Sequence, residues 1–72
     1  MKKKNKIKIK LNGKFIIIDD KITLQNLVKK FKVPIKKVAI ELNQTIVNKK
    51  RLDRIKISKN DKIEIVHFIG GG

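Results

Sequence analysis

The sequence predicts a single α+β domain in which one helix packs on one face of a mixed sheet of four to five strands. A hairpin signal near the start, one helical stripe and several short apolar segments after it support this class. Leu, Ile, Val and Phe make up 27 of 72 residues, enough for a core despite a net charge of +14. We expect a domain over residues 1–69, whose residues 1–6 form a basic, flexible leader, and a flexible glycine tail at 70–72.

The first element is an antiparallel hairpin. Isoleucine and leucine alternate with lysine up to Asn12-Gly13, which is typical of a half-buried strand. Asn-Gly is the strongest signal for a two-residue turn because both turn positions take positive φ. Such a turn pairs Leu11 with Lys14 and so places Phe15 and Ile17 on the face away from the core.

One helix follows the hairpin. Thr23 is a suitable N-cap, and Pro34 cannot continue a helix. The apolar residues between them have the spacing i, i+3, i+4 and i+7, which predicts a single buried stripe made of Leu24, Leu27, Val28 and Phe31.

The second half predicts three more strands. Residues 38–42 alternate, residues 46–47 form a short strand after a turn, and residues 48–57 are irregular and basic. The last strand runs from residue 62 to about 69. It can pair in parallel with the first strand in the middle of the sheet, which is the β-grasp arrangement.

Composition excludes several classes of protein. The chain has no Cys, so a disulfide framework, a thiolate zinc site and a cysteine nucleophile are excluded, and a reducing cytoplasm is expected. His67 is the one histidine, so we expect no metal site. The longest apolar run, residues 15–18, is far too short to span a membrane. A chain this small has little room for a catalytic pocket beside its core, so we expect no enzyme and no bound cofactor.

The positive charge has two interpretations. Lys, Ile and Asn fill 38 positions, and AT-rich codons encode all three, so genome composition alone can produce this bias. A basic nucleic-acid-binding module is the alternative. The chain holds only two Arg and three Phe for base readout and stacking, so we expect no specific nucleic-acid partner.

The informative element is the end of the sequence. The predicted last strand leads directly into Gly70, Gly71 and Gly72. Glycine has no Cβ, so such an arm can pass through a narrow channel. Its terminal carboxylate is ionised at neutral pH and can attack the α-phosphate of ATP. A sulfur nucleophile can then displace AMP from the adenylate and leave a thiocarboxylate.

These residues resemble a known family. The segments LNGK at 11–14, VAIELN at 38–43 and IEIVHFIGGG at 63–72 look like the sulfur carrier proteins of thiamine (thiazole) biosynthesis, which are ubiquitin-like β-grasp proteins. Gln44 and Asn60 depart from the pattern, since glycine is common at both turn positions.

The resemblance implies a specific mechanism. An adenylyltransferase similar to the ubiquitin-activating enzymes would use ATP and magnesium to adenylate Gly72. A sulfur donor system would form the thiocarboxylate, and thiazole synthase would take the sulfur. Gly71 and Gly72 would match the functional diglycine of the family, and Gly70 would extend the arm. The free protein is expected to be a cytoplasmic monomer with no membrane partner.

A docking face and three alternatives complete the predictions. The open face of the sheet should carry Phe15, Ile17, Val66 and Phe68, which we interpret as the surface that binds the partner enzymes. The carrier could instead serve molybdopterin synthesis or tRNA thiolation. A protein modifier joined to lysines through Gly72, and the nucleic-acid-binding module above, also stay open.

Overall fold

The computed structural model describes residues 5–68, so residues 1–4 of the expected leader and the expected tail lie outside the described residues. Along the chain the elements are β1 (Lys6–Leu11), β2 (Lys14–Asp19), α1 (Leu24–Lys30), the 3₁₀ helix η1 (Ile35–Lys37), β3 (Val38–Leu42), β4 (Thr45–Ile46), the 3₁₀ helix η2 (Lys49–Arg54) and β5 (Lys62–His67).

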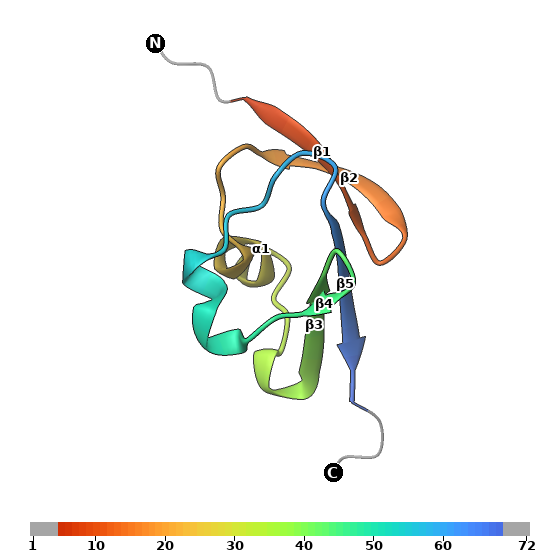
Figure 1. Cartoon of the computed structure of the whole chain (residues 1–72), viewed down its shortest axis with the longest axis vertical. Coiled ribbons are helices and arrows are strands. Elements are labelled where there is room, and N and C mark those ends of the chain that lie inside the picture. The colour runs from red at the N-terminus through yellow and green to blue at the C-terminus, as the bar shows by residue number, and fades with distance from the viewer. Residues whose placement is uncertain (1–4, 69–72) are drawn as a thin grey trace.

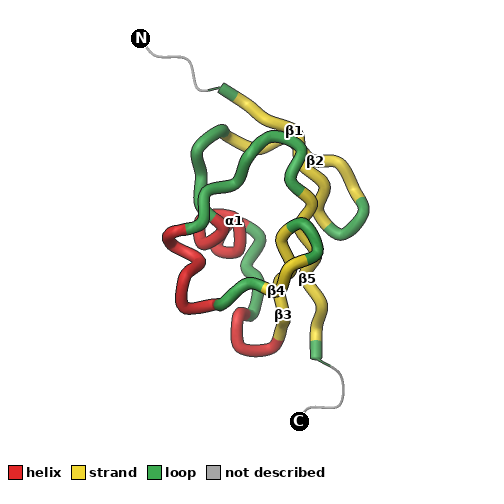
Figure 2. The backbone as a smooth tube through the Cα atoms, viewed as in Figure 1, coloured by secondary structure: helices red, strands yellow, loops and turns green. Residues whose placement is uncertain are grey.

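The five strands form one mixed sheet in the order β2-β1-β5-β3-β4. β5 pairs in parallel with β1 and antiparallel with β3, so the last strand lies in the centre. The helices α1 and η2 lie on the same side of this sheet (Figures 1 and 2). The predicted β-grasp fold, with one α-helix packed on one face, is therefore confirmed.

The hairpin has the predicted register. Leu11 lies opposite Lys14 and Ile9 lies opposite Ile16. The turn residues Asn12 and Gly13 have φ angles of 50° and 83°, as a turn with two left-handed positions requires.

The helix α1 is capped at both ends. The Thr23 hydroxyl accepts from the Asn26 backbone N–H at 3.1 Å, and the Asn26 side chain accepts from the Thr23 N–H at 3.0 Å. At the other end, the Val33 N–H donates to the Val28 carbonyl at 2.9 Å and closes a Schellman motif.

One residue of the predicted stripe is not buried. Leu24, Leu27 and Val28 are in the core, whereas Phe31 is 46% exposed. The helix ends at Lys30 and Phe31 is its C-cap, so the chain leaves the helical path before the stripe is complete. The expectation that all four residues pack in the core is wrong for Phe31.

The core lies between the sheet and the helices. It consists of Ile9, Ile18, Leu24, Leu27, Val28, Val38, Ile40, Leu52, Ile57 and Ile63. Leu52 belongs to η2, so the segment expected to be irregular contains a short helix that contributes to the core. Backbone hydrogen bonds from Leu24 to Ile55 and from Ile57 to Ile22 attach this segment to the start of α1.

Candidate functional site

The end of the central strand is the described element that leads, along the sequence, to the glycine tail. β5 ends at His67, and the Phe68 N–H still donates to the Lys37 carbonyl at 2.9 Å. The main chain is therefore tied to the start of β3 as far as Phe68. Four residues span about 14 Å when fully extended, which is the greatest distance between Phe68 and Gly72. Gly70, Gly71 and Gly72 lie outside the described residues, so their chemistry remains a prediction.

The four residues predicted for docking are all exposed, but strand alternation places only Phe15, Ile17 and Val66 on the open face. Phe68 follows the end of β5, and its ring lies beside the ammonium group of Lys49 from η2. The exposed fractions are 65% for Phe15, 60% for Ile17, 52% for Val66 and 60% for Phe68. Such exposure of large apolar side chains is unfavourable in water unless a partner covers them.

The structure does not bring these four residues together in one patch. Phe15 lies opposite Lys10 on β1, and Lys10 lies opposite Lys62 on β5. Val66 is four residues further along β5, which is about 13 Å at the rise of a strand. We therefore define a hairpin patch, Phe15 and Ile17, and a tail patch, Val66 and Phe68.

The hairpin patch has a basic rim. The ammonium groups of Lys8 and Lys10 lie 4.9 and 5.1 Å from the centroid of the Phe15 ring. A shallow pocket of about 270 Å³ adjoins the ring and includes Lys62 in its lining. This end of the face is suited to an apolar surface that also carries acidic groups.

A further apolar residue lies on the open face. Ile46 is 71% exposed and lies opposite Glu41 on β3, whose side chain points away from the buried Ile40. Ile46 was not among the predicted docking residues, although the two-residue turn at Asn43 and Gln44 sets a register that places it on this face.

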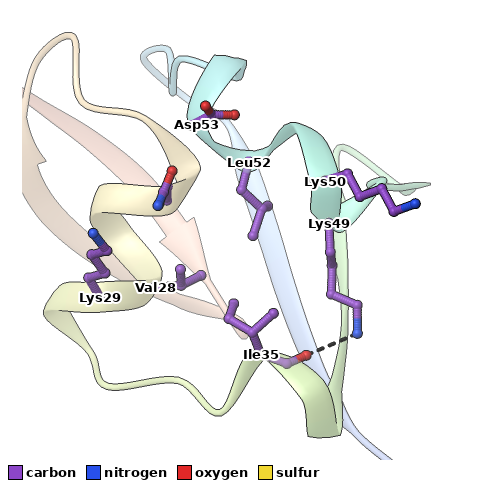
Figure 3. Close-up of a pocket in the computed structure, with 8 residues that line it drawn as sticks. Val28, Lys29, Ile35, Lys49, Lys50, Leu52 and Asp53 are labelled. Carbon is purple, nitrogen blue, oxygen red and sulfur yellow. Dashed lines mark hydrogen bonds between the residues drawn. The ribbon is translucent and has the colours of Figure 1, made fainter.

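A groove lies on the helical side of the sheet. It has a volume of about 390 Å³ and lies between α1 and η2 (Figure 3). Val28, Ile35 and Leu52 give it apolar walls. Lys49 reaches from η2 to the η1 turn, where its ammonium group donates to the Ile35 carbonyl at 2.9 Å.

Two further features concern metals and membranes. Among residues 5–68, no group of three or more His, Cys, Asp or Glu side chains is placed to hold a metal ion. Within the same range, no helix is long and apolar enough to cross a membrane.

Comparisons with known proteins identify the family. The model of the ThiS family matches residues 4–72. The chain is 38% identical over 65 residues to the sulfur carrier protein ThiS of Bacillus subtilis. This alignment covers 89% of this chain and 98% of that protein. The chain is also 36% identical over 66 residues to a thiazole synthase of Magnetococcus marinus, covering 92% of this chain but only 20% of that protein.

A solved structure agrees with these matches. The crystal structure of the thiamine biosynthesis protein ThiS from Geobacter metallireducens superposes with a TM-score of 0.81 and 26% identity, over 92% of this chain and all of that one. The chain therefore belongs to the ThiS family, the sulfur carriers of thiamine biosynthesis, which confirms the family predicted from the sequence.

Proposed function

We propose that this protein carries sulfur as a thiocarboxylate on Gly72 and delivers it for thiazole formation. The observation that carries the proposal is the family match, which runs through residue 72 and so includes Gly70, Gly71 and Gly72. The attachment of that tail to the central strand, through Phe68, supports it.

The chemistry proceeds in two balanced steps. A carboxylate oxygen of Gly72 attacks the α-phosphorus of ATP, and pyrophosphate leaves. Hydrosulfide supplied by the donor system then attacks the acyl carbon, AMP leaves with the oxygen that joined it to the protein, and loss of the S–H proton leaves the thiocarboxylate. In this scheme the chain is a substrate, whereas its partners catalyse and use the ATP and magnesium.

Two partner enzymes follow from this scheme. The first is an adenylyltransferase of the ubiquitin-activating type. The second is thiazole synthase. This chain is similar to one fifth of a protein of that name, which supports the pairing because that protein would then join a carrier domain and a synthase in one polypeptide. Since the reaction consumes ATP, we place it in the cytoplasm. The net charge of +14 favours a monomer when the protein is free.

We assign docking to the exposed apolar residues, with separate roles for the hairpin patch and the tail patch. The tail patch closely precedes the tail in the sequence and should contact any enzyme that binds Gly72. The hairpin patch is more distant and basic, so it should contact an acidic part of a partner.

Charged substitutions test this assignment one patch at a time. Phe68→Asp should weaken binding of the activating enzyme about tenfold or more, as burying an unpaired carboxylate in an interface requires. Phe15→Asp should weaken binding of whichever partner uses the hairpin patch. Titration calorimetry with each enzyme measures both effects, and Lys59→Gln on an exposed turn, which changes the net charge by the same one unit, is the control for charge alone. Unchanged affinity for both enzymes in both variants would remove the docking role.

The function itself is tested by intact-protein mass spectrometry. The protein is incubated with the activating enzyme, ATP, magnesium and a sulfur source. We expect a species in which one oxygen is replaced by sulfur, and fragmentation should localise the change to Gly72. A variant without Gly71 and Gly72 should remain unmodified and equally stable. An unmodified wild-type protein would contradict the proposal, and specific RNA binding that is indifferent to the deletion would favour the nucleic-acid-binding module instead.

The final acceptor is tested with the loaded protein. Thiazole synthase should consume the thiocarboxylate, as measured by loss of the added sulfur from the protein. If only a molybdopterin synthase or a tRNA-thiolating enzyme consumed it, the carrier would serve that pathway. Isopeptide-linked targets would instead indicate a protein modifier.

A further inference from the structure

Lys49 makes an unusual set of contacts for a lysine. It is the first residue of η2, and its ammonium group donates to two backbone carbonyls, at 2.9 Å to Ile35 and 2.7 Å to Val38 (Figure 3 shows the first). Both hydrogen bonds are partly buried. Ile35 begins η1 and Val38 begins β3, so Lys49 joins η2 to the segment that leads into β3.

The same ammonium group also lies beside Phe68. Its nitrogen is 5.4 Å from the centroid of the Phe68 ring, within the range of a cation–π interaction. The Phe68 backbone is also fixed near this place, because its N–H donates to the carbonyl of Lys37, the residue before Val38. The ring is 60% exposed, so packing alone constrains it weakly.

We propose that Lys49 is a positioning residue that fixes where the glycine tail leaves the domain. Phe68 is the last described residue before the tail, and its main chain and its ring are both held at the start of β3. Fixing this point reduces the conformational freedom that the tail must lose when Gly72 enters an active site. The inference rests on the proposed function, because it concerns how Gly72 is presented to the activating enzyme.

A purely structural role for Lys49 makes a different prediction. If Lys49 only stabilised the domain, its loss would lower the free energy of unfolding and would leave the folded protein an equally good substrate. A positioning role instead raises the KM for the carrier and leaves kcat almost unchanged, since the bound enzyme holds the tail in either case.

Three variants separate these roles. Lys49→Met keeps the length of the side chain and removes its charge and donors. Lys49→Arg keeps the donors and can lie against the Phe68 ring. Lys50→Met is the matched control, because Lys50 is the next residue and its side chain points away from Ile35 (Figure 3).

Two measurements are made on each variant. In adenylation assays, Lys49→Met should raise the KM about fivefold with kcat within about twofold, as expected for the loss of one cation–π contact and its hydrogen bonds. By NMR hydrogen exchange, its Phe68 amide should exchange about fivefold or more faster, whereas the amides of Ile40 and Ile65 should not change. Lys49→Arg should restore both values, and Lys50→Met should match the wild type.

Several outcomes would overturn the inference. They are an unchanged KM with unchanged Phe68 exchange in Lys49→Met, an equal rise of KM in Lys50→Met, and faster exchange throughout the core. If Lys49→Met proved too unstable to assay, Lys49→Gln, which removes the charge and keeps an N–H donor, should raise the KM in the same direction. Failure of the wild type to be adenylated would contradict the proposed function, while the Phe68 exchange rates would still decide the role of Lys49.

Discussion

At the scale of single residues, Asn12 has two roles that come from different parts of its structure. Its backbone takes the first left-handed position of the β1–β2 turn, with φ at 50°. Its side-chain oxygen accepts a 2.7 Å hydrogen bond from the Ile65 N–H, 53 residues away on β5. Asn12 therefore forms the hairpin turn and also attaches that turn to the strand that leads to the tail.

Two substitutions at this position separate the two roles. Asn12→Gly keeps the turn and loses the hydrogen bond, so it should destabilise the protein by about 1 kcal/mol. Asn12→Ala also places a Cβ in the left-handed region, so it should cost about 1 kcal/mol more. Urea denaturation measures both values. Equal stability of the two variants would show that the backbone conformation contributes little here.

At the scale of elements, the end of α1 has a conformation that usually requires glycine. Lys32 occupies the position after the C-cap with φ at 55°, and its N–H donates to the Lys29 carbonyl at 3.1 Å. Glycine is favoured in this position because it has no Cβ to strain. The helix thus ends in a Schellman motif that its own sequence does not favour.

A glycine at this position should stabilise the protein. Lys32→Gly should raise the free energy of unfolding by about 0.5–1 kcal/mol, because relief of the strain exceeds the added entropy of the unfolded chain. Lys32→Ala is the control, since it removes the same charge and keeps the strain. Thermal and urea denaturation of both variants test this, and an equal gain in Lys32→Ala would assign the effect to charge.

Local signals explain which elements could be predicted from the sequence. The Asn12-Gly13 turn and the alternating strands set the hairpin register because short-range sterics determine both. The loss of Phe31 from the core could not be predicted, since the helix ends at a lysine and not at a glycine. The helix η2 was missed because a short 3₁₀ helix has no apolar period to detect.

Some features of the candidate site could likewise be predicted from the sequence, and others could not. Alternation along β2 and β5 correctly predicted that Phe15, Ile17, Val66 and Phe68 are exposed. Their separation into two patches depends on the stagger that places Leu11 beside Ile63. That stagger is set by packing of the long crossover between parallel strands and not by any local signal. Lys49 could not be identified either, because its partners are backbone carbonyls distant in the sequence.

At the scale of the whole molecule, the scarcity of glycine in the turns and the excess of lysine are both consequences of the same compositional bias. Six residues between 5 and 68 other than glycine have positive φ, namely Asn12, Lys21, Lys32, Asn43, Gln44 and Asn60. Only Gly13 among the described residues is a glycine with positive φ. Asparagine tolerates this conformation best, whereas lysine and glutamine are strained by it. A bias toward AT-rich codons is sufficient to produce both features, because it favours lysine and asparagine and disfavours glycine.

The lysine excess should make stability depend on salt. The chain has twenty basic and six acidic residues. Lys10 on β1 lies directly opposite Lys62 on β5. Like charges in such a pair repel, and the repulsion is greatest at low ionic strength. We expect the free energy of unfolding to rise by about 1–2 kcal/mol when sodium chloride increases from about 10 mM to about 0.5 M, because the Debye length falls from about 30 Å to a few ångströms.

A variant and a neutral solute show whether charge causes this dependence. Lys62→Gln removes the repulsion with Lys10, so it should be more stable than the wild type at low salt and should gain less from added salt. Sucrose stabilises proteins without screening charge, so it should stabilise both proteins equally. Urea denaturation under the three conditions measures these differences. If salt lowered the stability of the wild type, attraction between opposite charges would outweigh the repulsion, and the surface charge would have to be interpreted as an organised feature of this protein.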